Sequence, residues 1–431
     1  MNLTKIKNFL QEEDRCLHEI TRLRGVVEQN FGNFMDAVYC EDREHALERA
    51  IVTVQHILED AVGSGVNFYE IGPGHGPGHL VRDFVNAYRL LKNSDFQPEE
   101  VYVGFVGGVL HDFGLAVVDR YQESNRVIRH AEAAAILQAY IEDPVASKNP
   151  GQDGLIKPLS HESLLFMYAM AAHTHYLKPM KVGEYEIRPY ADMIQGDRLV
   201  TGEEGEPFLP VWITRWVDRL DCGGPCFLGR HYLTLAEEHQ DYSSDQGFYD
   251  VKYANHMRPL LRENEEIAKA GDGRTMLEHY QMFANSQTNE SPYGRHDCGP
   301  MIRLRDDLRM MSLGQLLYVS MAGERQVSEN YEQVVREAWM HFLGSNIEPT
   351  SQGFKAAQVL DKMFGELPDE TRRIWAQGFY HCMQTYRTWA EAALRDLDDL
   401  APEQLSLPGI TPDVREVIEP ATSWESRLVR I

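Results

Sequence analysis

The feature of this sequence that most constrains its fold is a His-Asp pair inside an almost wholly apolar segment, residues 101–118 (VYVGFVGGVLHDFGLAVV). Burying an ionised carboxylate among apolar side chains is costly unless the carboxylate is paired or bound to a cation. The length of the segment favours a buried helix, although periodicity alone does not separate helix from strand here. We therefore expect His111 and Asp112 to lie in the core, compensated either by a neighbouring polar group or by a divalent metal.

Four other motifs carry histidine or aspartate on segments that the sequence pattern predicts to be helical. One precedes the His-Asp motif GGVLHDFG (107–114) and three follow it. They are GHLVRDFVNAYRLL (78–91), RHAEAAAIL (129–137), MAAHTHYL (170–177) and WVDRLD (216–221). Each motif alone is weakly specific, whereas five in one order are a much stronger signal.

In this order the motifs resemble the HD superfamily of metal-dependent phosphohydrolases, in its six-ligand form with the pattern His, His-Asp, His, His, Asp. The resemblance covers about residues 75–225. It implies a metal site made by His79, His111, Asp112, His130, His173 and Asp218. It also implies two divalent metal ions, of Mn, Fe, Ni, Zn or Mg, bridged by the Asp112 carboxylate. His75 and His175 each lie close to one of these positions and could replace it.

The activity that this resemblance implies is hydrolysis of a phosphoester. The chain would be a metal-dependent hydrolase, a phosphohydrolase or phosphodiesterase that acts on a nucleotide or another small phosphorylated metabolite through a metal-bridging hydroxide. Asp112 would then be catalytic, and Arg82 and Arg219 could neutralise phosphate oxygens. An ion pair with a neighbouring carboxylate is the alternative fate of each arginine.

Three alternatives stay open at this point. HD proteins with the same six ligands include mixed-valent diiron oxygenases, and four imidazoles with two carboxylates suit iron as well as hydrolytic metals. A second alternative is a non-catalytic HD scaffold. A third comes from residues 69–79 (YEIGPGHGPGH), which also resemble the first motif of a methyltransferase that uses S-adenosylmethionine, a motif that requires a strand, a glycine turn and a helix.

The fold class that we expect is all-α. An HD-domain helical bundle would occupy residues 61–235, after N-terminal helices at 1–60 and before an additional, mostly helical C-terminal region at 236–431. Between His175 and Val211, short alternating runs separated by glycines predict a small β-hairpin or lid insertion. Helices are also expected at 130–142, 161–175, 211–221, 328–344, 353–365 and 370–399.

Charge and composition exclude several classes of protein. The formal net charge of −24 disfavours nucleic-acid and membrane-surface partners, because phosphate backbones and anionic lipids would be repelled. Six cysteines in 431 residues are too sparse for a disulfide scaffold, and the N-terminus lacks the apolar run of a signal peptide. We therefore expect a cytoplasmic protein that binds a small phosphorylated substrate, and we leave open whether it forms a homo-oligomer.

Overall fold

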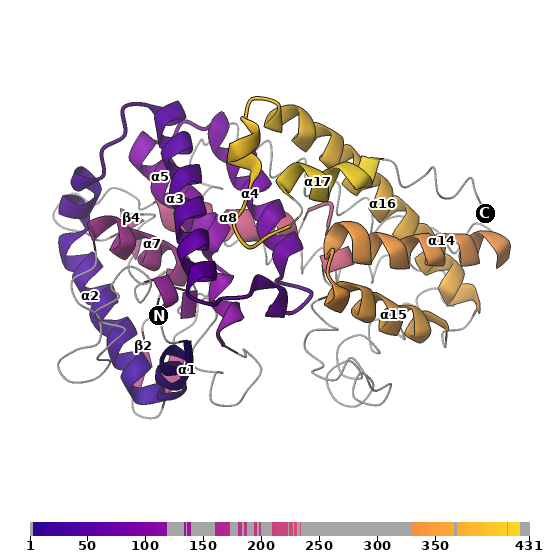
Figure 1. The fold of residues 1–431 in the computed structure, drawn as a ribbon, viewed down its shortest axis with the longest axis horizontal. Coiled ribbons are helices and arrows are strands. Elements are labelled where there is room, and N and C mark those ends of the chain that lie inside the picture. The colour runs from indigo at the N-terminus through magenta and orange to yellow at the C-terminus, as the bar shows by residue number, and fades with distance from the viewer. Residues whose placement is uncertain are drawn as a thin grey trace.

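The computed structural model describes most of the first 118 residues and most of residues 329–422, with shorter pieces between them. The described ranges are 3–118, 133–134, 136–138, 160–172, 180–182, 185–187, 194–195, 198–199, 209–222, 224–226, 228–230, 233, 329–365, 369–411 and 413–422. In these ranges the chain is predominantly helical (Figure 1). No helix in them is long and apolar enough to cross a membrane.

The N-terminal part consists of helices α1 (Leu3–Gln11), α2 (Glu13–Ala37) and α3 (Arg43–Gly63). Helix α3 begins at the N-cap residue Asp42, whose side chain accepts a hydrogen bond from the His45 N–H. Helix α2 packs against α7 (His161–Ala172), and α3 packs against the central helix α5 (Pro98–Leu110). The expected division after residue 60 therefore falls inside α3, a helix that belongs to the same hydrophobic core as α5.

Helices α4 (Pro77–Lys92) and α5 carry the first two motifs, and each has a proline in its first turn, where no backbone N–H is needed. Helix α5 is buried from Val101 to its end, so the prediction of a buried helix is confirmed. The helix stops at Leu110, earlier than the apolar run does. His111 is its C-cap, and Asp112 leads into the 3-10 helix η2 (Phe113–Ala116).

Helix α8 (Leu209–Cys222) lies directly against α5 because small residues on α5 allow a close approach. A Cβ atom added at Gly104 would lie 2.6 Å from Ile213 Cδ1, and one at Gly107 would lie 2.6 Å from Thr214 Oγ1. Helix α5 also contacts α3, α4 and α7, so it is the centre of the bundle. The motif at the C-terminal end of α5 is thus enclosed by neighbouring helices.

The segment expected to form a hairpin or lid contains two short antiparallel pairs of strands. Strand β1 (Met180–Val182) pairs with β2 (Tyr185–Ile187), and β3 (Ile194–Gln195) pairs with β4 (Arg198–Leu199). The role of this segment as a lid stays a prediction.

The methyltransferase motif needs a strand just before its glycine turn. Residues 68–70 instead form the 3-10 helix η1 (Phe68–Glu70), and the methyltransferase alternative is therefore wrong.

In the C-terminal region the described residues, within 329–422, are helical as expected from the sequence pattern, whereas residues 236–328 lie outside the described residues. Its elements are α14 (Glu329–Phe342), the π-helical turn η8 (Leu343–Ile347), α15 (Ser351–Gly365), α16 (Asp369–Leu397), η9 (Pro402–Leu405), α17 (Val414–Ile418) and η10 (Glu419–Thr422). Elements α16, α17 and η8 contact α4, and Figure 1 shows this orange-to-yellow part beside the purple helices. Trp389 Nε1 donates to Asn86 Oδ1 at 3.3 Å across that contact. The C-terminal helices therefore pack onto the helix that carries His79.

Candidate metal centre

Four of the six expected ligands lie in described parts of the chain, and the fold brings their side chains together in the core. His79 comes from the first turn of α4, His111 and Asp112 from the end of α5, and Asp218 from α8. His79 Nε2 lies 3.1 Å from Asp112 Oδ2 and 3.8 Å from Asp218 Oδ1. His111 Nε2 lies 3.4 Å from Asp112 Oδ2 and 3.9 Å from Asp218 Oδ1.

The separations of both imidazoles from Asp112, 3.1 and 3.4 Å, suit a shared cation, and those from Asp218, 3.8 and 3.9 Å, are longer. Ligand atoms bound to one zinc-like ion at bond lengths of about 2.0–2.2 Å lie roughly 3–3.5 Å from one another. Imidazole nitrogens combined with carboxylate oxygens are a set that Zn, Mn, Fe and Ni accept. The residues present at this site therefore fit a divalent metal ion.

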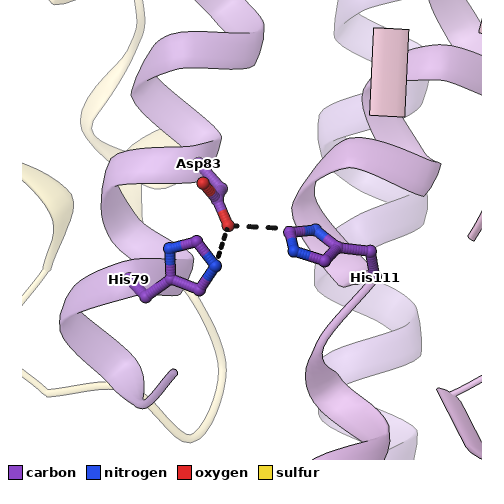
Figure 2. Close-up of side chains that lie close together, drawn as sticks. All are labelled: His79, Asp83 and His111. Carbon is purple, nitrogen blue, oxygen red and sulfur yellow. Dashed lines mark ion pairs between the residues drawn. The ribbon is translucent and has the colours of Figure 1, made fainter. Parts of the chain in front are cut away.

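Asp83 is a further candidate ligand that the sequence motifs did not single out. It lies one turn after His79 on α4, and its Oδ2 is 3.0 Å from His79 Nε2 and 3.9 Å from His111 Nδ1 (Figure 2). The three side chains form a buried group that could hold a metal ion. Asp83 Oδ1 is also buried, without a hydrogen-bond partner in the described part of the chain. The signal that could have found Asp83 is the spacing of four from His79, which puts both on one helix face.

Both histidines are oriented by a partner on Nδ1. The Nδ1–H of His111 donates to the carbonyl oxygen of Gly108 at 2.7 Å, and His79 Nδ1 lies 2.8 Å from Asp221 Oδ2. Such partners fix the ring so that Nε2 becomes the atom presented to a metal. Asp221 follows Asp218 by three residues on α8, so the two carboxylates share a helix face.

Arg82 is buried and bonded to other parts of the protein. Its Nε lies 2.6 Å from Asp221 Oδ1 and its Nη2 lies 3.1 Å from Asp221 Oδ2, while its Nη1 donates to the carbonyl oxygen of Ile347. The side chain is 1% exposed. Of the two fates expected for Arg82, the structure shows the ion pair with a carboxylate: Arg82 braces Asp221, which in turn orients His79, and contact with a phosphate stays a prediction.

Two other arginines lie beside Asp218. Arg219 is 25% exposed, with its Nη1 3.7 Å from Asp218 Oδ2, so it lies at the edge of the cluster. Arg230 is buried, with its Nη1 2.7 Å from Asp218 Oδ1 and its Nη2 2.9 Å from His79 Nε2. Arg230 belongs to none of the five motifs, and we find no signal in the sequence that would have selected it.

The carboxylates around the two histidines dominate their protonation. Burial lowers the pKa of His111, but Asp112, Asp83 and Asp218 outweigh it and raise the pKa to about 9. Burial and Arg230 lower the pKa of His79, yet Asp83, Asp112 and Asp221 raise it well above its ordinary value. This negative environment favours positive charge beside the two imidazoles, which a proton on His111, the Arg230 guanidinium beside His79 or a divalent cation can supply.

Of the remaining candidate metal ligands, only His75 lies in the described part of the chain. His130, His173 and His175 lie outside the described residues. His75 is buried with its ring centroid 6.0 Å from that of His79, in an edge-to-face arrangement. Comparison with family models, with curated proteins and with solved structures finds no match for this chain.

Proposed function

We propose that this protein is a metal-dependent hydrolase of the HD type, a phosphohydrolase or phosphodiesterase that acts on a nucleotide or another small phosphorylated metabolite. The observation that carries the proposal is the convergence of His79, His111, Asp112 and Asp218 at donor separations of 3.1–3.9 Å. These residues are spread over about 140 positions of sequence and three helical elements. Such a cluster of buried ionisable groups, drawn from distant parts of the sequence and with raised histidine pKa values, is typical of a functional site.

The chemistry follows from what the side chains hold in place. A bound divalent cation would polarise a phosphoryl oxygen and acidify a water molecule. His79 and His111 present Nε2 in fixed orientations because Asp221 and the Gly108 carbonyl hold their other nitrogen. Asp112 Oδ2 lies within 3.4 Å of both imidazoles, where a carboxylate can also accept the proton of an attacking water.

The exposed edge of the cluster is the part that can receive an anionic substrate. Arg219 is a quarter exposed and lies beside Asp218, so its guanidinium can turn toward a phosphate oxygen without leaving a buried carboxylate unpaired. The acidic chain would also repel a phosphate group less here than elsewhere, because a bound metal cation would reverse the local potential.

A second metal ion is part of the proposal and needs His130 and His173. In the HD pattern these two histidines would hold the second ion, with Asp112 as the bridge. Two bound cations would together supply the positive charge that stabilises the transition state of phosphoester hydrolysis. The ratio of metal to protein therefore distinguishes the one-metal and two-metal forms of the proposal.

The experiment that tests the proposal combines elemental analysis of the purified protein with a screen of phosphorylated metabolites for phosphate release. Mn, Ni or Zn with phosphate release supports hydrolysis. Iron with dioxygen uptake would instead support the diiron oxygenase, and bound metal without turnover of any compound would support a scaffold.

A matched pair of variants links the activity to the cluster. His111→Ala should remove metal and activity, because His111 is buried at the centre of the donor set. His56→Ala, an exposed histidine on α3, should change neither. Activity that survives His111→Ala would contradict the proposal.

A further inference from the structure

The side chain of Arg230 lies against the very atoms that the proposed centre needs. Its Nη1 is 2.7 Å from Asp218 Oδ1 and its Nη2 is 2.9 Å from His79 Nε2. Its Nε donates to the Gly74 carbonyl oxygen at 3.2 Å, and Nη1 also reaches the Asp218 carbonyl oxygen at 3.2 Å. The guanidinium is therefore held from several sides, in a part of the core that is almost closed to solvent.

The charges around Arg230 explain why a cation is needed there. Asp221 is matched by Arg82 through two hydrogen bonds. Arg230 lies 4.0 Å from Asp112 Oδ2 and 3.6 Å from Asp221 Oδ2, in addition to its bond with Asp218. Buried carboxylates without a compensating charge cost several kcal/mol each. Arg230 supplies that charge in the structure described here.

A metal ion and Arg230 cannot hold the same two atoms at once. A cation bound to His79 Nε2 and Asp218 Oδ1 would lie about 2.0–2.2 Å from each of them. The guanidinium nitrogens already stand at 2.7–2.9 Å from these atoms, and two like charges in that space would repel each other strongly. Metal binding therefore requires the Arg230 guanidinium to leave His79 and Asp218.

We propose that the Arg230 guanidinium and a divalent metal ion compete for His79 Nε2 and Asp218 Oδ1, so that metal binding displaces the arginine from both atoms. This inference rests on the proposed metal centre and adds that Arg230 lowers the affinity of that centre for metal. Arg230 stabilises the metal-free protein and weakens metal binding, because displacement of its hydrogen bonds is part of the binding reaction. The carbonyl oxygen of Gly74 remains as an anchor for the displaced side chain.

The test is a calorimetric titration of the full-length protein with Mn²⁺, and in parallel with Zn²⁺, after removal of metal with a chelator. Arg230→Met keeps most of the volume but removes the charge and the donors. We expect it to bind metal at least about tenfold more tightly than the wild type, which corresponds to about 1.4 kcal/mol. We also expect its metal-free form to unfold at a lower temperature, and saturating metal to reverse that loss.

Arg89→Met is the matched control. Arg89 lies on α4, the same helix as His79, but outside the cluster. Its Nε is 2.8 Å from Asp396 Oδ2. Its removal should leave metal affinity unchanged. An equal gain in affinity in both variants would mean that any loss of positive charge strengthens binding, and would overturn the specific role of Arg230.

Three further outcomes separate this inference from the proposed function. Unchanged or weaker metal binding by Arg230→Met, in a protein whose wild type binds metal, overturns the inference alone. If neither Mn²⁺ nor Zn²⁺ binds the wild type, both proposals fail. If Arg230→Met does not fold, Arg230→Lys is the deciding variant, because a single ammonium group cannot donate to both His79 and Asp218 as the guanidinium does. Tighter metal binding by Arg230→Lys than by the wild type supports the inference. Unchanged or weaker binding overturns it.

Discussion

Glu348 accepts a hydrogen bond from the backbone N–H of Gly78 at 3.1 Å, although the two residues lie 270 positions apart in the sequence. Gly78 directly precedes His79, and the carbonyl oxygen of Ile347, next to Glu348, accepts from Arg82. The end of η8 therefore contacts α4 at two points, Gly78 in the first turn and Arg82 one turn later. The C-terminal helices thus help to hold His79 in place.

The first prediction concerns the space at that contact. A Cβ atom at Gly78 would lie 2.2 Å from the Ile347 carbonyl oxygen and 3.0 Å from Glu348 Oε2, and backbone cannot yield as a flexible side chain does. Gly78→Ala should therefore destabilise the protein by about 1–3 kcal/mol in urea unfolding followed by circular dichroism. The control is Gly25→Ala, in helix α2 with nothing within 4 Å of the new atom. It should stabilise by about 0.5–1 kcal/mol, and equal effects of the two substitutions would contradict the close contact.

The second prediction is a dependence of stability on pH. Burial raises the pKa of Glu348 to about 8 from its ordinary value of 4.5, against the opposing effects of Arg82 and the Gly78 N–H. Between these two values the folded protein binds the proton more tightly than the unfolded chain, so the free energy of unfolding falls as the pH rises from about 5 to about 8. Glu348→Gln should remove this part of the slope and be the more stable protein at the upper end of that range.

A denaturant titration at several pH values measures the effect. Glu337→Gln, an exposed glutamate on the neighbouring helix α14, is the control and should leave the slope unchanged. A wild-type protein and a Glu348→Gln variant with parallel pH profiles would show that Glu348 is ionised in the folded protein throughout the range.

The sequence was most informative where a polar residue interrupts an apolar pattern. The apolar run at 101–118 predicted a buried helix, and the interruption by His111 and Asp112 marked the place of the cluster. His79 and Asp218 followed from the order of the motifs. The apolar pattern marks His111 and Asp112, whereas His79 and Asp218 are expected only from the resemblance to the HD superfamily, and the ligand roles of all four stay a proposal.

The residues that the sequence did not indicate depend on tertiary contacts. Asp221 lies in the motif WVDRLD, three residues after Asp218. This spacing is a signal that both carboxylates share one face of the helix. Arg230 and Glu348 have no such pattern, because their roles arise only when distant elements pack against α4. The sequence also does not show that the Arg82 guanidinium pairs with Asp221, because the two residues come together only when α4 packs against α8.

The third prediction distinguishes a bracing role of Arg82 from substrate contact. Removing one partner of a fully buried ion pair costs about 3–5 kcal/mol, so Arg82→Met should lower the free energy of unfolding by that amount. The partly buried pair that Arg89 makes on the same helix, in which Arg89 is 13% and Asp396 36% exposed, should cost less, about 1 kcal/mol, when Arg89 is replaced by Met. Chemical denaturation of both variants measures the difference. An Arg82→Met protein as stable as the wild type, with only a raised KM for a phosphorylated substrate, would restore the role first expected for Arg82.

The metal content of Asp112→Ala, measured by mass spectrometry after saturation with Mn²⁺ or Zn²⁺ and gel filtration, tests the central claim most directly. Asp112 Oδ2 lies 3.1 Å from His79 Nε2 and 3.4 Å from His111 Nε2. Asp112→Ala therefore removes a carboxylate oxygen that lies close to both imidazoles. We predict at least one equivalent of metal in the wild type and in the exposed control Asp60→Ala, and none in Asp112→Ala. A wild type that takes up no metal, or an Asp112→Ala variant that retains the full equivalent, would contradict the account.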